Sequence, residues 1–136
     1  MWQAKALTRF VRHLRLRREL DIISFSGFRL ETLRNSPPNP GVPELLEMLD
    51  VVIDGPYIRK YDDGVGLRGS SNQRIHHLTH RLDDFDFDSA PRRVEIHVLD
   101  GQALMVGVPT QGVVSAFNHT MDKLLHVRRM VCHERA

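Results

Sequence analysis

Apolar positions in the first twenty residues recur at helical spacing. This pattern predicts an amphipathic helix over residues 2–19. The apolar face of the predicted helix consists of Leu7, Phe10, Val11 and Leu14. Arginines take most of the opposite face, so the chain is expected to begin with a surface helix.

Two short apolar runs follow, and each predicts a strand that is buried on both faces: residues 21–26 and residues 50–54. Between them lie a short helix or turn at 29–34, a proline-rich loop at 35–41 and a helix at 43–49. Short apolar strands that alternate with helices are typical of parallel βα units. The first half of the chain is therefore expected to be an α/β fold.

Apolar and polar residues alternate strictly near the carboxyl end of the chain. Strands are predicted at residues 92–98 and 103–108, and Asp100-Gly101 between them is a strong hairpin signal. A helix is predicted over residues 113–130. This β-hairpin and helix are expected to form a separate region.

The middle of the chain shows no clear periodic pattern of hydrophobic residues. Residues 58–74 are glycine-rich and predicted to be irregular, and residues 74–82 are predicted to form a short helical turn. The resulting division is an α/β region over residues 1–90 and a hairpin-helix region over residues 91–136.

Composition is that of an ordinary globular protein, with 41% hydrophobic and 26% charged residues among 136. The single cysteine, Cys132, excludes a disulfide within the chain. There is no run of about 18 apolar residues and no secretory signal pattern. We therefore expect a cytoplasmic protein with no membrane partner.

The net charge is only +2, but basic residues crowd the first helix. One interpretation is a nucleic-acid-binding helix, whose affinity would depend on Arg12 and Arg15. The favoured interpretation is a solvated outer face, because no aromatic side chains interleave the arginines to stack on bases. No nucleic-acid partner is expected, and the acidic residues 83–88 are expected to form an exposed loop.

Polar side chains follow both apolar strands of the first half. Ser24 and Ser26 end the first strand and Asp54 ends the second, so they are expected at one rim of the sheet, where α/β folds bind ligands. Asp54 is either a ligand-binding carboxylate or the cap of the turn that it makes with Gly55-Pro56. Position alone favours the cap.

The run from Arg68 to Arg74 brackets a Gly-Ser-Ser-Asn-Gln segment with two guanidinium groups. Such a run suits a carboxylate or phosphate, which arginine binds through two parallel hydrogen bonds. An equally supported interpretation is a polar loop whose side chains satisfy its own backbone.

Histidines suggest a metal site only weakly. His76 and His80 have the i, i+4 spacing of helical metal ligands, but a solvated basic patch is the favoured interpretation. Cys132 beside His133 is interpreted as an ordinary thiol rather than a nucleophile. We predict no metal ligands and no catalytic residues in this chain.

Several segments form a pattern when taken in order. They are Gln3–Leu7, Phe25-Ser26-Gly27-Phe28, Asp50–Tyr57 and Leu67–Arg74, followed by the hairpin. Over residues 3–112 the pattern resembles the activating enzymes of anaerobic ribonucleotide reductase, within the radical S-adenosylmethionine (SAM) superfamily. The resemblance implies a partial (β/α) barrel with parallel strands, followed here by the β-hairpin and helix.

The resemblance also implies cofactors and site residues. Such enzymes reduce SAM at a [4Fe–4S] cluster and use the resulting radical to activate a glycyl-radical reductase subunit. By resemblance, Ser24, Ser26 and Asp54 line the SAM site, and Arg68 and Arg74 hold the methionyl carboxylate. The partner implied is the reductase subunit.

Two motifs of that family are not found in this sequence. One is the Cys-x3-Cys-x2-Cys loop that holds the cluster, and the other is the Gly-Gly-Glu-Pro motif that binds SAM. Met1 aligns one residue past the second motif. We therefore expect a carboxyl-terminal portion that is inactive alone. The alternative is a non-catalytic module that docks on a reductase or an intact activase, with self-association through exposed strand edges.

Overall fold

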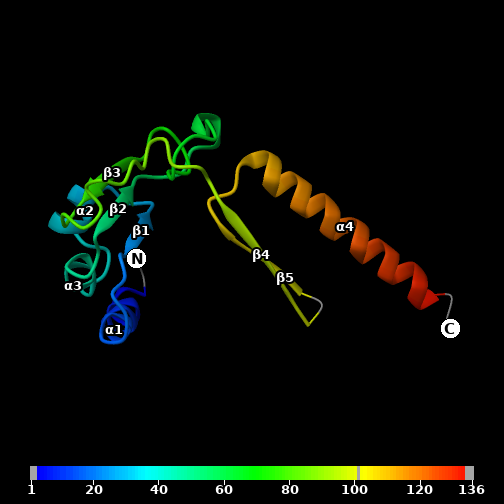
Figure 1. The fold of residues 1–136 in the computed structure, drawn as a ribbon, viewed down its shortest axis with the longest axis horizontal. Helices are drawn as coiled ribbons and strands as arrows, with labels where there is room; N and C mark the ends of the chain where they lie inside the picture. The colour runs from blue at the N-terminus through cyan, green and yellow to red at the C-terminus, as the bar shows by residue number, and fades with distance from the viewer. Residues whose placement is uncertain (1–2, 101, 134–136) are drawn as a thin grey trace. The chain divides into compact units, whose positions relative to one another are not determined.

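The computed structural model describes residues 3–100 and 102–133, with side chains up to residue 124. The chain divides into two compact units, residues 1–90 and 91–136. The first unit contains α1 (Ala4–Arg15), β1 (Ile23–Ser26), α2 (Leu30–Asn35), α3 (Val42–Leu46), β2 (Val51–Asp54), the 3₁₀ turn η1 (Arg59–Tyr61) and β3 (Arg74–His77) (Figure 1). The second contains β4 (Val94–Leu99), β5 (Gln102–Gly107) and α4 (Gln111–His133).

The first unit is built on a three-stranded sheet in the order β1-β2-β3. β1 and β2 are parallel, and their register pairs Ser26 with Asp54. β3 runs antiparallel to β2 and pairs Arg74 with the same Asp54. The polar ends of three strands therefore meet in one row across the sheet.

β2 is the centre of this unit, and the prediction that it is buried on both faces is confirmed. Val52 packs against the helices, in a core that contains Ala4, Leu33, Val42, Leu45 and Leu49. Val51 and Ile53 face the other way and pack on Phe87. A continuous apolar run is required because both faces of this strand are covered.

The prediction that residues 74–82 form a helical turn is wrong at its start, because residues 74–77 form β3. The sheet of the first unit is therefore mixed, because β3 runs antiparallel to β2 whereas β1 and β2 are parallel as expected. Four residues carry too little periodicity to identify a strand. Pairing with the buried strand β2 decides the conformation, and Ile75 packs beside Ile53.

The prediction that the first strand is buried on both faces is also wrong. Ile23 and Phe25 are 38% and 49% exposed. β1 is an edge of the sheet and pairs only with β2 among the described residues. The face of β1 that carries Ile23 and Phe25 remains open, and β1 (Ile-Ser-Phe-Ser) is a less continuous apolar run than β2 (Val-Val-Ile-Asp).

The buried face of α1 agrees with the predicted apolar face at Val11 but not at Leu7 and Phe10. Leu7 and Phe10 are exposed, whereas Ala4, Thr8 and Val11 are buried. The turn before α3 approaches α1 closely, because a Cβ on Gly41 would lie 2.6 Å from the Lys5 Cγ. Small side chains are needed where the turn before α3 approaches α1 this closely.

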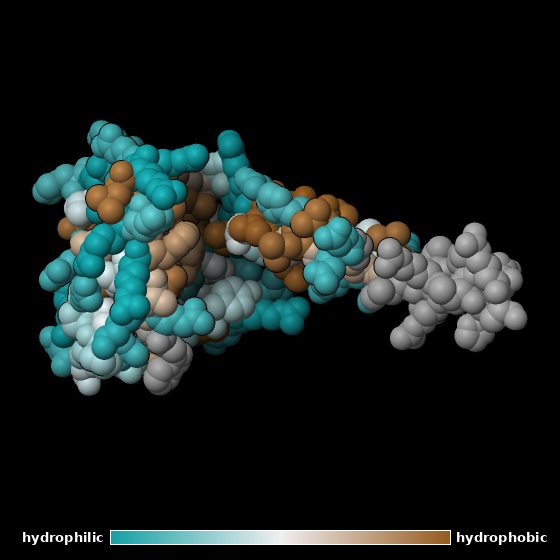
Figure 2. All heavy atoms as spheres, turned by 90° about the horizontal axis from the view of Figure 1, so that it is seen from below, coloured by the Kyte–Doolittle hydropathy of each residue, from teal (hydrophilic) through white to brown (hydrophobic). Residues whose placement is uncertain are grey.

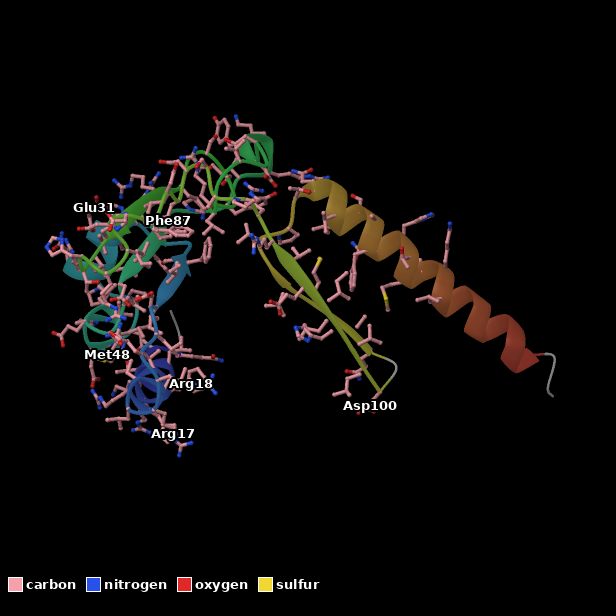
Figure 3. All side chains as sticks on the ribbon, viewed as in Figure 1. Arg17, Arg18, Glu31, Met48, Phe87 and Asp100 are labelled. Carbon is pink, nitrogen blue, oxygen red and sulfur yellow. The ribbon has the colours of Figure 1, made fainter. Side chains whose placement is uncertain are left out.

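In the second unit, β4 and β5 form an antiparallel hairpin, and α4 follows. Asp100 has a φ of 51°, the left-handed conformation expected in an Asp-Gly hairpin turn, and lies at the tip (Figure 3). Gly101 and the side chain of Cys132 lie outside the described residues. No helix in the described part of the chain has the length and apolar character needed to cross a bilayer.

Candidate functional site

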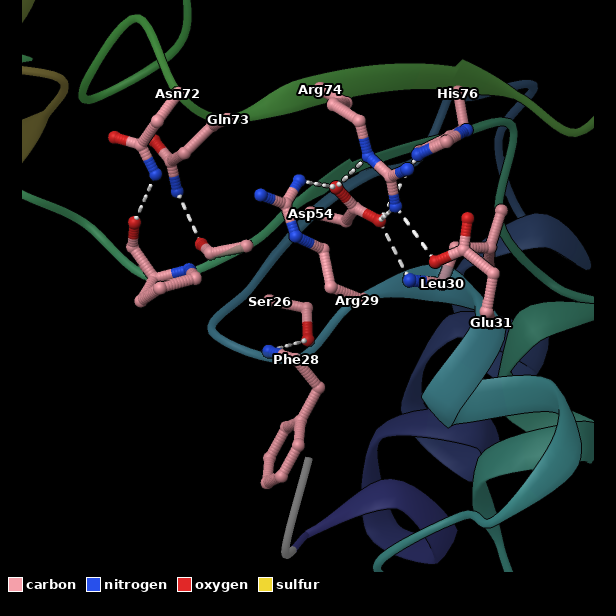
Figure 4. Close-up of polar contacts among 12 residues, drawn as sticks. Ser26, Phe28, Arg29, Leu30, Glu31, Asp54, Asn72, Gln73, Arg74 and His76 are labelled. Carbon is pink, nitrogen blue, oxygen red and sulfur yellow. Dashed lines mark hydrogen bonds and ion pairs between the residues drawn. The ribbon is translucent and has the colours of Figure 1, made fainter.

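The carboxyl ends of β1 and β2 form the candidate site, as the sequence predicted for Ser26 and Asp54 (Figure 4). The Ser26 hydroxyl is buried and accepts a hydrogen bond from the Phe28 N–H at 3.1 Å. Ser24 lies two residues earlier, opposite Val52, and is half-buried. Ser26 therefore shapes the turn after β1.

Asp54 is fully buried and is surrounded by donors. Its Oδ2 accepts from the Leu30 N–H at 2.6 Å and from Arg74 Nη2 at 2.7 Å. Its Oδ1 accepts from Arg74 Nε at 3.1 Å and from Arg29 Nη1 at 3.3 Å. Asp54, at the end of β2, thus caps the first turn of α2. It also accepts hydrogen bonds from Arg74 with both carboxylate oxygens.

The electrostatics of Asp54 follow from these contacts. Burial raises the pKa of its carboxyl group, but hydrogen bonds from Arg74 and the Leu30 N–H outweigh burial and hold the pKa below the ordinary aspartate range. Asp54 is therefore a carboxylate at neutral pH. The alternative of a local cap for Gly55-Pro56 is replaced by a cap for α2, 24 residues away in sequence.

Arg74 links Asp54 to the surface. Its Nη2 also donates to the Glu31 Oε2 at 2.7 Å. The two carboxylates raise the pKa of Arg74, and the hydrogen bond from Arg74 lowers the pKa of Glu31. His76 Nε2 lies 3.0 Å from Asp54 Oδ2, yet the angles do not make a hydrogen bond and this buried nitrogen has no other partner. This contact is an ion pair only when His76 is protonated.

Arg29 is the rim residue that the sequence prediction missed. Its guanidinium lies against Gly55, where a Cβ would be 3.2 Å from the Arg29 Cζ. Gly55 has a φ of +99°, which favours glycine on its own account. A cation at the start of α2 opposes the helix dipole unless an acid is near, and this was the available signal. Arg29 and Arg74 are 41% and 43% exposed, so both reach solvent from the Asp54 cluster.

Side chains of the Arg68–Arg74 run form hydrogen bonds with the backbone of the Asp-Gly-Pro-Tyr turn. Gln73 donates to the Gly55 carbonyl at 2.9 Å, and Asn72 donates to the Pro56 carbonyl at 2.9 Å (Figure 4). The buried Ser70 hydroxyl accepts from the Ile58 N–H at 3.1 Å. The two motifs singled out in the sequence therefore form one unit. These side chains bond the backbone of residues 55–58, whereas the polar-loop interpretation expected bonds to the loop's own backbone.

The two arginines of that run have different partners. Arg74 lies on Asp54, whereas Arg68 pairs with Asp88 at 3.1 Å and approaches Asp63 at 3.9 Å. The structure thus brings together Ser26, Asp54 and Arg74. Arg68 contacts the acidic loop instead, which was expected only to be exposed.

A second buried carboxylate, Asp50, was not singled out in the sequence. It accepts from Arg15 Nη2 at 2.6 Å, the Ile22 N–H at 2.8 Å and the Thr79 hydroxyl at 2.8 Å. Burial raises its pKa, but the bonds from Ile22 and Thr79 outweigh this and the pKa is lowered. Asp50 precedes β2, so it ties α1 and β1 together at the end of the sheet opposite the candidate site.

The contacts of α1 also bear on the nucleic-acid alternative. Arg15 is held by Asp50, and Arg12 pairs with Glu44 at 2.8 Å. Both arginines named for that alternative are therefore bound to carboxylates of the protein itself. This leaves them less available to phosphates.

The histidine pattern does not form a helical metal site. His76 lies in β3, and the His80 side chain is 99% exposed and pairs with Asp83 at 2.7 Å. Among the residues described, no group of three His, Cys, Asp or Glu side chains is arranged to hold a metal ion.

Comparison with known proteins gives one family. A family model described as a 4Fe-4S single cluster domain matches residues 1–76, and the chain belongs to this family. The match is compatible with an iron–sulfur protein of radical SAM type. No curated protein and no solved structure matches the chain.

The residues present do not fit the family's cluster. Iron–sulfur clusters are held by several cysteine thiolates. Residues 1–76 contain no cysteine, and the chain has only Cys132. The matched segment therefore lacks the donor set for a [4Fe–4S] cluster.

Proposed function

We propose that residues 1–90 are the carboxyl-terminal part of a radical SAM-type partial (β/α) barrel from an activase of anaerobic ribonucleotide reductase. The family match over residues 1–76 supports the coarse class. The parallel pair β1-β2, with Ser26 and Asp54 side by side at its carboxyl end, supports the barrel. The motif order in the sequence supports the activase and its glycyl-radical partner.

In this proposal the chain supplies a cofactor-binding rim and no cluster ligands. Ser24, Ser26, Asp54 and Arg74 remain the proposed SAM-site residues, whereas Arg68 pairs with Asp88 and is not part of the Asp54 cluster. The contacts divide them by role. Ser26 and Asp54 are occupied by backbone and arginine donors, so they position the rim. Guanidinium groups with solvent exposure are the groups suited to bind a carboxylate.

The observation that carries the rim assignment is the convergence of two half-exposed guanidiniums, Arg29 and Arg74, on one buried carboxylate. Asp54 fixes both cations in place at the strand ends. Because Arg74 is also committed to Glu31, Arg29 has the weaker internal contact, at 3.3 Å. We therefore add Arg29 as the group that contacts the methionyl carboxylate of SAM.

Substitution of Arg29 tests this assignment. Arg29→Gln should weaken SAM binding by roughly tenfold, the effect of one lost charge-assisted hydrogen bond. Binding of 5′-methylthioadenosine, which has no aminocarboxylate, should not change. Equilibrium dialysis against both compounds measures the difference.

The matched control for that experiment is Arg34→Gln, in the last turn of the same short helix α2. It removes the same charge and should leave SAM binding unchanged. Equal losses for the two variants, or equal losses for both compounds with Arg29→Gln, would contradict the assignment.

A second candidate function is a non-catalytic docking module. It is favoured by the absence of cysteine from residues 1–76 and by the open edge strand β1 with exposed Ile23 and Phe25. An open strand edge can pair with a strand of another protein. A purified chain that binds neither SAM nor methylthioadenosine but forms a defined complex with a reductase would favour this function.

A further inference from the structure

The β4-β5 hairpin exposes large apolar side chains on both of its faces. Ile96 and Val98 are 54% and 72% exposed on one face, and Leu104 and Val106 are 62% and 50% exposed on the other. Figure 2 shows hydrophobic side chains at the surface of this region. Isolated hairpins are marginal in water, and a third strand or a packed face is needed for independent stability.

The two edges of the hairpin differ in charge. β4 carries Glu95 and His97, which approach each other at 3.2 Å. β5 carries no charged side chain from Gln102 to Gly107. Natural sheets protect free edges with charged residues, prolines or bulges, because unpaired N–H and C=O groups recruit other strands. β5 has no such side-chain protection.

The pattern of backbone hydrogen bonds between β4 and β5 shows which backbone N–H and C=O groups point away from the hairpin. The Val108 N–H donates to the Arg93 carbonyl at 3.3 Å, so residues 93 and 108 form a hydrogen-bonded pair. Such pairs alternate along an antiparallel ladder. Ile96 and Met105 are opposite each other and fall in a non-hydrogen-bonded pair. Their backbone groups therefore point away from the hairpin, on opposite edges.

We propose that β5 is a self-association edge, at which two copies of this chain pair β5 with β5 antiparallel about a two-fold axis. The partner strand is identical, so the pairing is self-complementary and brings no like charges together. The product is a four-stranded sheet with the charged β4 edges outermost. This surface lies in residues 91–136 and is independent of the proposed SAM rim.

The test is the mass of the full chain in solution, measured by sedimentation velocity over a concentration series. The unchanged chain should be a dimer. Met105→Pro removes the outward N–H of β5 and should give a monomer at concentrations at which the unchanged chain is dimeric. Ile96 is the register partner of Met105. Ile96→Pro removes an outward N–H from β4, and this variant should remain a dimer.

Three results would overturn the proposal: a monomeric unchanged chain, two dimeric proline variants, or equal dissociation by both. Because proline can unfold a hairpin, Met105→Lys and Ile96→Lys provide a second pair. Met105→Lys places like charges across the proposed axis, so it should dissociate the dimer at low salt and less so at high salt. Ile96→Lys should have no effect on the mass.

Discussion

Asp54→Ala is expected to lower the free energy of unfolding by about 3–5 kcal/mol, the usual cost of removing one partner from a buried ion pair. The substitution removes the acceptor of the Leu30 N–H and of the Nε–H and Nη2–H donors of Arg74. Because domains are stable by only about 5–15 kcal/mol, this loss is large. Urea denaturation followed by circular dichroism measures it.

The control for Asp54 is Asp84→Ala, an exposed aspartate in the loop after β3. Its effect should lie within about 0.5 kcal/mol, as for most surface substitutions. Acid provides a second comparison. The pKa of Asp54 is lowered by folding, so its contribution is complete above the unfolded aspartate pKa of roughly 3.9 and is lost as the pH falls below it. Equal stability of the two variants at neutral pH would contradict the proposed role of Asp54.

Asp50→Ala is expected to have a comparable effect, about 3–5 kcal/mol, for the same physical reason. Asp50 is fully buried, and its loss removes the acceptor of Arg15, the Ile22 N–H and the Thr79 hydroxyl. The expected result is a destabilised sheet at the end away from the rim. Urea denaturation measures this, and SAM binding of the remaining folded chain should be unchanged.

The matched pair for Asp50 lies on α1. Arg15→Ala removes a partner of the buried Asp50, whereas Arg12→Ala removes the exposed pair with Glu44. Arg12→Ala should cost at most about 1 kcal/mol, as surface ion pairs do. If Arg15→Ala and Arg12→Ala were equally mild and Asp50→Ala matched them, Asp50 would not hold α1 to the sheet.

The sequence predicted the candidate site where local chemistry and strand position coincide. A buried parallel strand shows itself as a continuous apolar run, which is why β2 and the polar Asp54 at its end were recognised. The pairing of Ser26 with Asp54 followed because parallel strands end at the same rim.

The parts that sequence could not predict depend on contacts between distant segments. β3 is a strand because its backbone pairs with the edge of β2. The register of this pairing places Arg74 opposite Asp54. The buried face of α1 depends on how closely the turn at Gly41 approaches Lys5. The contacts of Arg29 with Asp54 and Gly55 likewise join segments that are distant in the sequence.

We propose that this chain carries a cofactor-binding rim, and it lacks the ligands of the family's cluster. Anaerobic reconstitution of the purified chain with iron and sulfide, followed by removal of unbound metal and quantification of both, tests it most directly. The account predicts no stable [4Fe–4S] cluster, because residues 1–76 contain no cysteine. One stable cluster per chain, with its visible absorbance, would contradict it.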